Sequence, residues 1–582
     1  MNFSVLSASN IKQEIFNMLK ISSSEIRTCI SKLADNIRAE NIEYESYLKM
    51  YSGEENILNI DNKNNTVIYG RRGSGKTHLL KALQENIMNR FSDDKVFPVY
   101  IDARRIVPLV PSSESSSEIN SILIFKYLMQ ELSHNLAVNV NTIYDLNPFD
   151  SSSSFSRDMW KEEINNLFQG VYLEFDGRTF SKPTSLTVSE EEVKSLSGNG
   201  GLSSSPKLEV SGKIERKNSG TREKNSYISI LDITNHVENL IGKLGINRLT
   251  LIIDEWSEIE IDTQIHLAEI LKKSFSAIPV TLKIAAIPNR TNLGIKREQK
   301  FFGLEDGGDI FGYQLDMRYV FEVNKTQTRD FFNDLLYKHL YSLNANAINS
   351  LLRDHKTKPQ KIINLFLANV ALNEIFIASA GIPRDFMNLF IGAYDKFIIS
   401  SNQSAKRIGV KHLRTANSEW YETDKKKQVD KHAVERHLLT EIVREIIENK
   451  KSIHFLVPEK YSQNKHIQNL IDFRVMHLRR NGYSHKDHPG VSYNVYSIDY
   501  GCYNSLNISK KKLDSSMLDN LQLNDFRDIR RISLEDTFFN RFLIDIGEAF
   551  SCPHCKQPID TNHLAYVKQS LCNNCFEKVT QQ

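Results

Sequence analysis

Eight consecutive residues have the composition and spacing of a phosphate-binding loop. They follow the pattern G-x-x-x-x-G-K-[ST] and are Gly70, Arg71, Arg72, Gly73, Ser74, Gly75, Lys76 and Thr77. Glycines allow the backbone to turn its N–H groups towards an anion, and a helix that follows adds its positive end. Lys76 is placed to reach the β- and γ-phosphates, and Thr77 to ligate Mg²⁺. The segment therefore predicts a site for ATP and Mg²⁺.

A second motif supplies two adjacent carboxylates at the end of an apolar run. Residues 249–253 are typical of a buried parallel strand, and Asp254 and Glu255 follow directly. We expect Asp254 to hold Mg²⁺, directly or through water, and Glu255 to polarise the attacking water. Alone, the motif would be an ordinary strand end with solvated acids. Together with the phosphate-binding loop, it predicts hydrolysis of ATP.

Four cysteines near the C-terminus have the spacing of a zinc ribbon. Two C-x₂-C pairs are separated by sixteen residues and consist of Cys552, Cys555, Cys572 and Cys575. Four protein thiolates leave no open position on the metal, so we expect a structural Zn²⁺. An iron–sulfur cluster or a redox pair is the alternative. The remaining cysteines, Cys29 and Cys502, are expected to be ordinary core or surface thiols.

The elements around the first two motifs alternate between strand and helix. Apolar runs predict strands at residues 66–69, 96–102, 249–254 and 280–287. Helical patterns are found at residues 78–83, 122–132, 226–244 and 263–275. This alternation indicates an α/β fold with a doubly wound parallel sheet, in which ligands bind at the carboxyl ends of the strands. Asp254 and Asn289 both fall at such ends.

The chain between the two nucleotide motifs is longer than a compact α/β core requires. Residues 150–225 are rich in serine and glycine, and we interpret them as a flexible insertion, with a hairpin near 207–213 as one interpretation. Such an insertion is either a tolerated surface loop or a partner-binding element.

The C-terminal third predicts two helices followed by a hairpin. The expected elements are helices at 438–447 and 464–480, a turn at 483–490 and a strand at 491–500. This is the order of a winged-helix domain, whose second helix enters the major groove of DNA. Residues 405–488 hold 18 Lys and Arg against 11 Asp and Glu, a local net charge of +7, which fits contact with nucleic acid. The expected DNA contacts are Lys465, Arg474, Arg479, Arg480 and Lys486. A solvated basic face, or a winged helix that binds protein, is the alternative.

The composition of the whole chain is that of a globular protein of several domains. Its 582 residues are 25% charged and 40% hydrophobic, and the net charge is only +3. The sequence lacks an apolar run of about 18 residues and a basic segment followed by an apolar one at the N-terminus. We therefore expect a cytoplasmic protein without membrane contact.

The order of these parts resembles an AAA+ ATPase, in particular the initiator clade of origin-recognition and Cdc-type proteins. Asn289 is similar to the first sensor of that family, with Arg290 or Thr291 as alternatives, and residues 321–340 resemble the start of its helical lid. The segment Gly381-Ile382-Pro383-Arg384 resembles the G-x-P-R second sensor, where an arginine contacts the nucleotide. The resemblance covers about residues 60–500.

The resemblance also implies how the molecule works and assembles. Such ATPases usually complete their site with an arginine from a neighbouring subunit, and Arg297 and Arg318 are the candidates. The expected domains are an N-terminal helical segment (1–60), the AAA+ α/β domain (61–300), a helical lid (301–400), a winged helix (401–510), and a linker with the zinc ribbon (511–582). Bacterial relatives of this clade imply a role in phage or mobile-element defence.

The expected function is an ATP-hydrolysing switch that binds DNA or a nucleoprotein through its C-terminal modules. Its expected partners are DNA and either further copies of itself or an effector protein. One alternative is a protein-remodelling or signalling ATPase of the STAND type, whose C-terminal modules bind proteins. A second alternative is a scaffold that binds nucleotide without turnover, and the presence of Glu255 argues against it.

Overall fold

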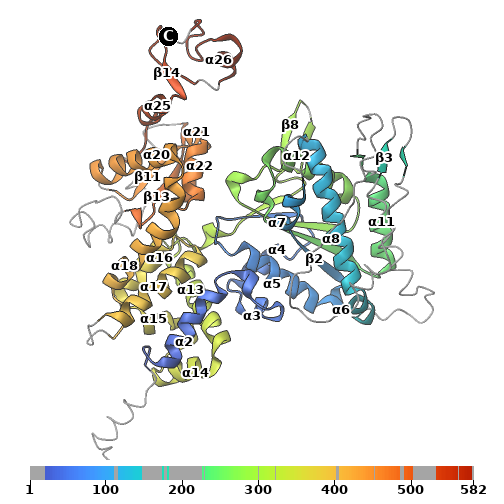
Figure 1. The fold of residues 1–582 in the computed structure, drawn as a ribbon, viewed down its shortest axis with the longest axis vertical. Helices are drawn as coiled ribbons and strands as arrows, with labels where there is room; N and C mark the ends of the chain where they lie inside the picture. The colour runs from blue at the N-terminus through green and yellow to red at the C-terminus, as the bar shows by residue number, and fades with distance from the viewer. Residues whose placement is uncertain are drawn as a thin grey trace, which may run out of the picture.

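A five-stranded parallel sheet forms the centre of the nucleotide-binding domain (Figure 1). Its order is β10-β1-β7-β6-β2, with β1 Thr66–Tyr69, β2 Val96–Asp102, β6 Arg248–Asp254, β7 Val280–Ala286 and β10 Phe311–Gln314. The computed structural model describes residues 20–110, 116–146, 230–298, 300–321, 323–400, 406–450, 452–484, 490–502, 532–560 and 563–579, and strands β3 Leu173–Phe175, β4 Phe180–Ser181 and β5 Ser226–Tyr227. The predicted α/β class with a parallel sheet is confirmed.

Helices cover both faces of this sheet because its strands are apolar on both sides. One face packs against α8 Ser117–Leu146, α11 Ile230–Lys243 and α12 Ile261–Phe275. The other face packs against α5 Lys76–Asn89 and the short helices α3 Tyr47–Met50 and α4 Glu54–Ile60. The helix predicted at 226–244 begins later than expected, since residues 226–227 form β5. The hairpin proposed near 207–213 lies outside the described residues.

The strand register brings the site residues to one edge of the sheet. Asp102 lies opposite Asp254 at the ends of β2 and β6. Tyr69 lies opposite Ala286 at the ends of β1 and β7, so the loop after β1 and the turn after β7 are neighbours. A hairpin, β8 Gly294–Arg297 with β9 Lys300–Gly303, follows β7 before the chain returns to β10.

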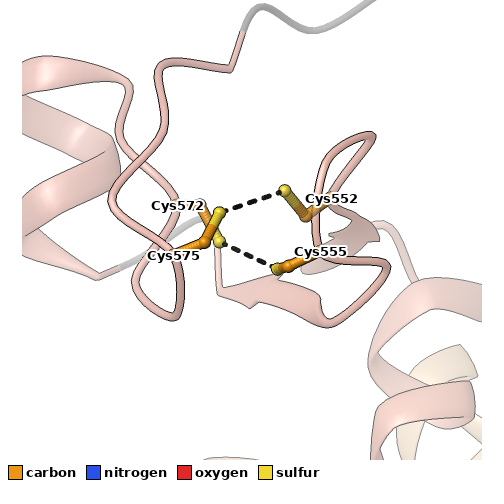
Figure 2. Close-up of side chains that lie close together, drawn as sticks. All are labelled: Cys552, Cys555, Cys572 and Cys575. Carbon is orange, nitrogen blue, oxygen red and sulfur yellow. Dashed lines mark hydrogen bonds between the residues drawn. The ribbon is translucent and has the colours of Figure 1, made fainter.

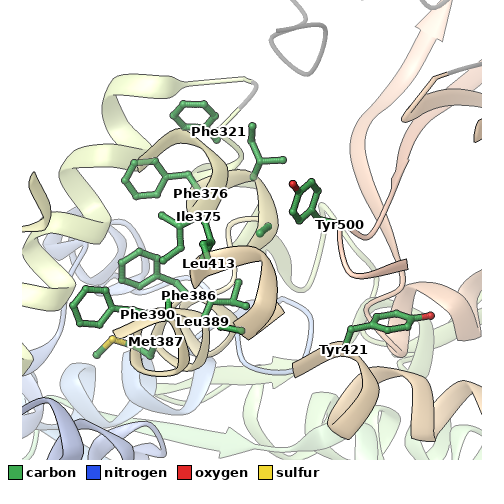
Figure 3. Close-up of a cluster of buried hydrophobic side chains, with 14 of the residues drawn as sticks. Phe321, Ile375, Phe376, Phe386, Met387, Leu389, Phe390, Leu413, Tyr421 and Tyr500 are labelled. Atoms are coloured by element: carbon green, nitrogen blue, oxygen red, sulfur yellow. The ribbon is translucent and has the colours of Figure 1, made fainter. Parts of the chain in front are cut away.

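The lid is a bundle of helices that shares one continuous core with the winged helix. It comprises α13 Lys325–Leu343, α14 Ala345–Asp354, α15 Ile363–Phe366, α16 Asn369–Ala378, α17 Pro383–Ile399 and α18 Val410–Trp420. Phe376, Phe386 and Phe390 stack in its centre, and Tyr500 from the winged helix reaches the same cluster (Figure 3). The N-terminal helix α2 Ser24–Leu33 buries its apolar face in this core.

The C-terminal third folds into the predicted winged helix, with an antiparallel sheet ordered β11-β13-β12. Its elements are α20 Ala433–Val443, β11 His454–Pro458, α21 Glu459–Ser462, α22 Lys465–Asp472, β12 Met476–Ser484 and β13 Ser492–Ile498. The helix predicted at 464–480 is wrong beyond Asp472, because residues 476–484 form strand β12 instead.

The early end of α22 has a clear cause in its backbone. Arg474 adopts a left-handed conformation with φ of 60°. The N–H of Val475 donates to the carbonyl of Leu470 at 3.1 Å, and the N–H of Arg474 donates to Ile471 at 3.0 Å. These two hydrogen bonds form a Schellman motif, which ends a helix.

The C-terminal ribbon lies at the far end of the winged helix from the lid (Figure 1). Helix α25 Asp536–Asp545 leads into it, and α25 packs into the winged-helix core through Phe538, Phe539 and Phe542. The ribbon itself comprises the hairpin β14 Ala549–Ser551 with β15 Pro558–Asp560, and α26 Leu564–Gln569.

Candidate nucleotide site and zinc site

A cavity of about 360 Å³ lies at the carboxyl edge of the parallel sheet, beneath the lid. Phosphate-binding loop residues, Glu255 and the lid residues Pro383 and Arg384 line it together with the N-terminal segment 36–40. The volume falls in the range of small-molecule sites. The structure thus brings the loop, the acidic strand and the second-sensor arginine together, although 110 or more residues separate each from the next.

The loop has the backbone geometry that an anion site requires. Gly73 and Gly75 have φ of 84° and 93°, which a residue with a side chain rarely adopts. A Cβ atom at Gly73 would lie 2.8 Å from the Cβ of Arg384, so the lid approaches the loop closely only because this residue is glycine. Lys76 Nζ donates to the carbonyls of Gly70 at 2.7 Å and Arg71 at 3.3 Å.

Asp254 occupies the position expected of the Mg²⁺-binding carboxylate. Its side chain is fully buried, and its Oδ2 accepts a hydrogen bond of 2.7 Å from the hydroxyl of Tyr100. The backbone N–H of Glu255 donates to Oδ1 at 2.8 Å. Burial raises the pKa of Asp254, while hydrogen bonds from Tyr100 and Thr77 oppose that rise. Asp254 and Thr77 are therefore adjacent oxygen donors that fit Mg²⁺.

Glu255 faces the cavity from the residue after the strand. Its φ of 55° turns the chain sharply at the end of β6. Burial, and then the neighbouring Asp254, raise the pKa of Glu255. Arg104 Nη1 lies 3.9 Å from Glu255 Oε1, and Nη2 of the same guanidinium pairs with Asp102 at 2.6 Å. A carboxylate with a raised pKa beside the phosphate-binding loop is suited to orient and polarise a water.

The two sensor candidates differ in their placement. Arg384 lines the cavity, its backbone N–H donates to Gly73 at 3.2 Å, and burial lowers its pKa. Asn289 lies in the turn 288–290, outside the residues that line the cavity. Of its neighbours, Arg290 pairs with Asp472 of the winged helix at 2.5 Å, and Thr291 contacts Ser257 at 3.0 Å.

Several residues of the site carry no signal in the sequence. Tyr100 and Arg104 reach it through the register of β2 beside β6, and the N-terminal segment 36–40 closes it from the start of the chain. His339 lines the same cavity from lid helix α13. These positions belong to no short motif, so only the tertiary structure places them.

The two arginines considered for a neighbouring subunit lie away from the cavity. Arg297 is exposed on the β8–β9 hairpin, with its guanidinium carbon 4.1 Å from the ring centre of Phe302. Arg318 donates a hydrogen bond to the hydroxyl of Tyr313. Neither lines the cavity formed by its own chain.

The four ribbon cysteines converge on one point (Figure 2). The sulfur atoms of Cys552 and Cys575 are 3.8 Å apart, and those of Cys555 and Cys572 are 3.7 Å apart. A tetrahedral ion with Zn–S bonds of about 2.3 Å holds its sulfurs about 3.8 Å apart, so this arrangement fits zinc. Backbone N–H groups outweigh the effect of burial and lower the pKa of Cys552 to about 6. The other two cysteines, Cys29 and Cys502, are buried in the lid and winged-helix core.

The residues predicted to contact DNA do not share one helix. Lys465 begins α22, is exposed, and pairs with Glu548 at 2.6 Å. Arg474 and Arg479 are buried; Arg474 pairs with Asp385 and Asp424, and Arg479 donates to Ser497. Arg480 is exposed on β12, and Lys486 lies outside the described residues. The expectation that Arg474, Arg479 and Arg480 lie on the second helix is therefore wrong.

A comparison with protein-family models identifies the family of the chain. The family model described as ORC-CDC6-like matches residues 33–501, and the chain belongs to this family of AAA+ ATPases. Among solved structures, the chain is similar to Aeropyrum pernix ORC1 in complex with DNA, with 12% identity, a TM-score of 0.25, and coverage of 83% of this chain and 96% of that one. It is also similar to Drosophila ORC bound to DNA, with 10% identity, a TM-score of 0.28, and coverage of 80% and 90%.

A search of curated protein sequences finds no match. The comparisons do not support the role in defence that the resemblance implied. In the part of the chain that the structure describes, every helix is too short or too polar to span a bilayer.

Proposed function

We propose that this protein is an ATP-hydrolysing molecular switch that engages DNA, or a nucleoprotein, through its winged helix and zinc ribbon. The observation that carries the proposal is the convergence of Lys76, Thr77, Glu255 and Arg384 on one cavity, with Asp254 buried one residue before Glu255. Lys76 and Arg384 would hold the phosphates, and Thr77 and Asp254 would hold Mg²⁺, which neutralises phosphate charge when bound. Glu255 would orient the attacking water.

The DNA partner rests on the family and on the winged-helix topology. Lys465 and Arg480 are exposed on the described winged helix and are the proposed phosphate contacts, with Lys465 exchanging its ion pair with Glu548 for one with a phosphate. Completion of the nucleotide site by Arg297 or Arg318 of a second copy would make the active form an oligomer. The alternative to a homo-oligomer is an effector protein that binds this chain in place of a second copy.

Steady-state ATP hydrolysis, with and without duplex DNA, tests the proposal. Glu255→Gln should lower kcat by about 100-fold or more while nucleotide binding persists, because it removes the group that polarises water. Lys76→Ala should weaken nucleotide binding itself. Glu258→Gln is the matched control, since Glu258 lines the same cavity but lies on its exposed rim, paired with Arg72 at 3.3 Å.

Three outcomes separate the candidate functions. Hydrolysis stimulated by DNA and abolished by Glu255→Gln supports the proposed switch. Hydrolysis that ignores DNA but responds to a protein partner favours the STAND-type alternative. Nucleotide binding without hydrolysis in the wild type leaves a nucleotide-gated scaffold, and the proposed ATPase would then be wrong.

A further inference from the structure

Arg71 is a phosphate-loop residue that points away from the nucleotide cavity. Its side chain is 6% exposed, and Nε pairs with Asp316 Oδ2 at 2.5 Å, while Nη2 donates to the carbonyl of Ala380 at 3.1 Å. Its remaining nitrogen, Nη1, lies 2.8 Å from Nδ1 of His477, the second residue of strand β12. The phosphate-binding loop is therefore joined directly to the winged helix, across 406 positions of sequence.

The polarity of this contact follows from the groups involved. A guanidinium only donates hydrogen bonds, so His477 Nδ1 accepts one and the ring proton resides on Nε2. Nε2 in turn donates to Asp499 Oδ2 at 2.9 Å. Burial keeps the ring neutral by lowering the pKa of His477 to about 3. His477 thus links a loop cation to a winged-helix carboxylate without carrying charge itself.

From Asp499 the chain of contacts returns to the phosphate-binding loop. Lys425 Nζ pairs with Asp499 at 2.6 Å and with Asp385 at 3.0 Å, and all three side chains are almost completely buried. Burial disfavours the ammonium, but Asp385 and Asp499 nevertheless raise the pKa of Lys425. Asp385 directly follows Arg384, whose backbone N–H donates to Gly73 of the loop at 3.2 Å. These contacts therefore connect the phosphate-binding loop to the winged helix, the winged helix to the lid, and the lid back to the loop.

We propose that His477 is a positioning residue for the phosphate-binding loop, supplied by the winged helix, so that nucleotide occupancy and the seating of the winged helix are coupled. This inference rests on the proposed function. Lys76 Nζ donates to the carbonyls of Gly70 and Arg71. Phosphates that draw the ammonium away from these carbonyls would free the backbone of Arg71 to move, and His477 would follow through its contact with the guanidinium.

Because these contacts are buried, they hold the winged helix rigidly against the phosphate-binding loop. Removing one partner of a buried ion pair is strongly destabilising, because the other charge remains in a low-dielectric environment. The winged helix therefore cannot shift relative to the loop while the loop keeps its geometry. Because coupling between two sites is reciprocal, a ligand that moves the winged helix must also change nucleotide affinity.

Hydrogen exchange of the full-length protein, with and without Mg²⁺–ATPγS, tests the inference without any DNA. In the wild type, amides of β12 and β13 should change their exchange rates by about fivefold or more when the analogue binds. His477→Phe fills the same space but neither accepts from Arg71 nor donates to Asp499, so this response should disappear. Affinity for the analogue should change by a similar factor, because the coupling between the two sites is reciprocal.

Three further variants separate coupling from simple loss of packing. His477→Gln keeps an acceptor and a donor and should restore at least part of the response. His454→Phe is the matched control, because His454 is a buried histidine paired across β13 with Ser497, as is His477. The control should respond to the analogue as the wild type does. Arg71→Met breaks the same contact from the loop side and replaces His477→Phe if that variant does not fold.

The outcomes distinguish this inference from the proposed function. A nucleotide titration of the wild type is measured first, and absence of binding overturns the proposed function and the inference together. Binding without any exchange response in the winged helix overturns the inference alone. A full response in His477→Phe or Arg71→Met also overturns it, because the contact would then carry no coupling.

Discussion

Tyr100 holds the carboxylate at the centre of the nucleotide site. Its hydroxyl donates to Asp254 at 2.7 Å and opposes the rise in pKa that burial imposes. Tyr100→Phe removes this bond, so the ionised carboxylate that Mg²⁺ needs becomes less favourable. We expect the Mg²⁺ concentration for half-maximal ATP hydrolysis to rise by up to about tenfold, which corresponds to about 1.4 kcal/mol, with kcat recovering at saturating Mg²⁺.

Tyr69→Phe is the matched control for this prediction, since it loses the same hydroxyl on β1, a strand of the same sheet that β7 separates from the Asp254 strand β6. Its Mg²⁺ dependence should equal that of the wild type. An unchanged Mg²⁺ dependence in Tyr100→Phe would mean that the tyrosine does not position Asp254.

The residues that sequence alone could place are those that stand in contiguous motifs. The phosphate-binding loop, Asp254 with Glu255, and the four cysteines each encode their chemistry within a few positions. Tyr100, by contrast, meets Asp254 only because Asp102 lies opposite Asp254 in the sheet. Such a contact depends on strand order and register, and hydrophobic pattern alone determines neither.

At the scale of elements, the boundary between α22 and β12 could not be predicted from the sequence, and the reason is physical. The apolar residues of 464–480 fit a helical period, and no glycine marks the turn. Arg474 takes the left-handed position usually given to glycine. Its guanidinium is held there by Asp385 of the lid and by Asp424. A tertiary ion pair thus stabilises a local conformation that intrinsic preference opposes.

The ribbon is the element whose fold should depend on metal. Its small apolar cluster consists mainly of the cysteines, with Ile559 and Val579, which is too little to stabilise it alone. We expect about one zinc per chain by elemental analysis, and Cys575→Ser should lose it. Amides of 549–579 should then exchange rapidly, while the ATPase rate without DNA should stay within about twofold, because the nucleotide site lies in another domain.

Cys29→Ala provides the control, because Cys29 lies in the lid core and its loss should leave the zinc content unchanged. Iron in place of zinc, or full metal content in Cys575→Ser, would contradict the assignment of these four cysteines as a structural zinc site.

For the whole molecule, the ion pair between Arg290 and Asp472 makes a second connection between the nucleotide domain and the winged helix. The pair is 2.5 Å long, and the side chain of Asp472 is only 4% exposed, while that of Arg290 is 35% exposed. The winged helix is built around one continuous core, which it shares with the lid. We therefore expect it to open from the nucleotide domain as one rigid body. The Arg290–Asp472 pair and the Arg71–His477 contact then both stabilise the closed position of the winged helix against the same opening.

Arg290→Ala should therefore affect parts of the winged helix that Arg290 does not touch. Leaving Asp472 buried without its partner costs less than for a fully buried pair, about 1–2 kcal/mol, because Arg290 is partly solvated. Amide exchange at the interface residues of both α22 and β12 should accelerate by the same factor, about 5- to 30-fold, in the absence of nucleotide. Arg353→Ala is the control, since Arg353 is 79% exposed and contacts only its neighbour Asp354 among the ion pairs described. Acceleration confined to the residues beside Asp472 would mean that the two contacts act locally, and that the winged helix does not move as a unit.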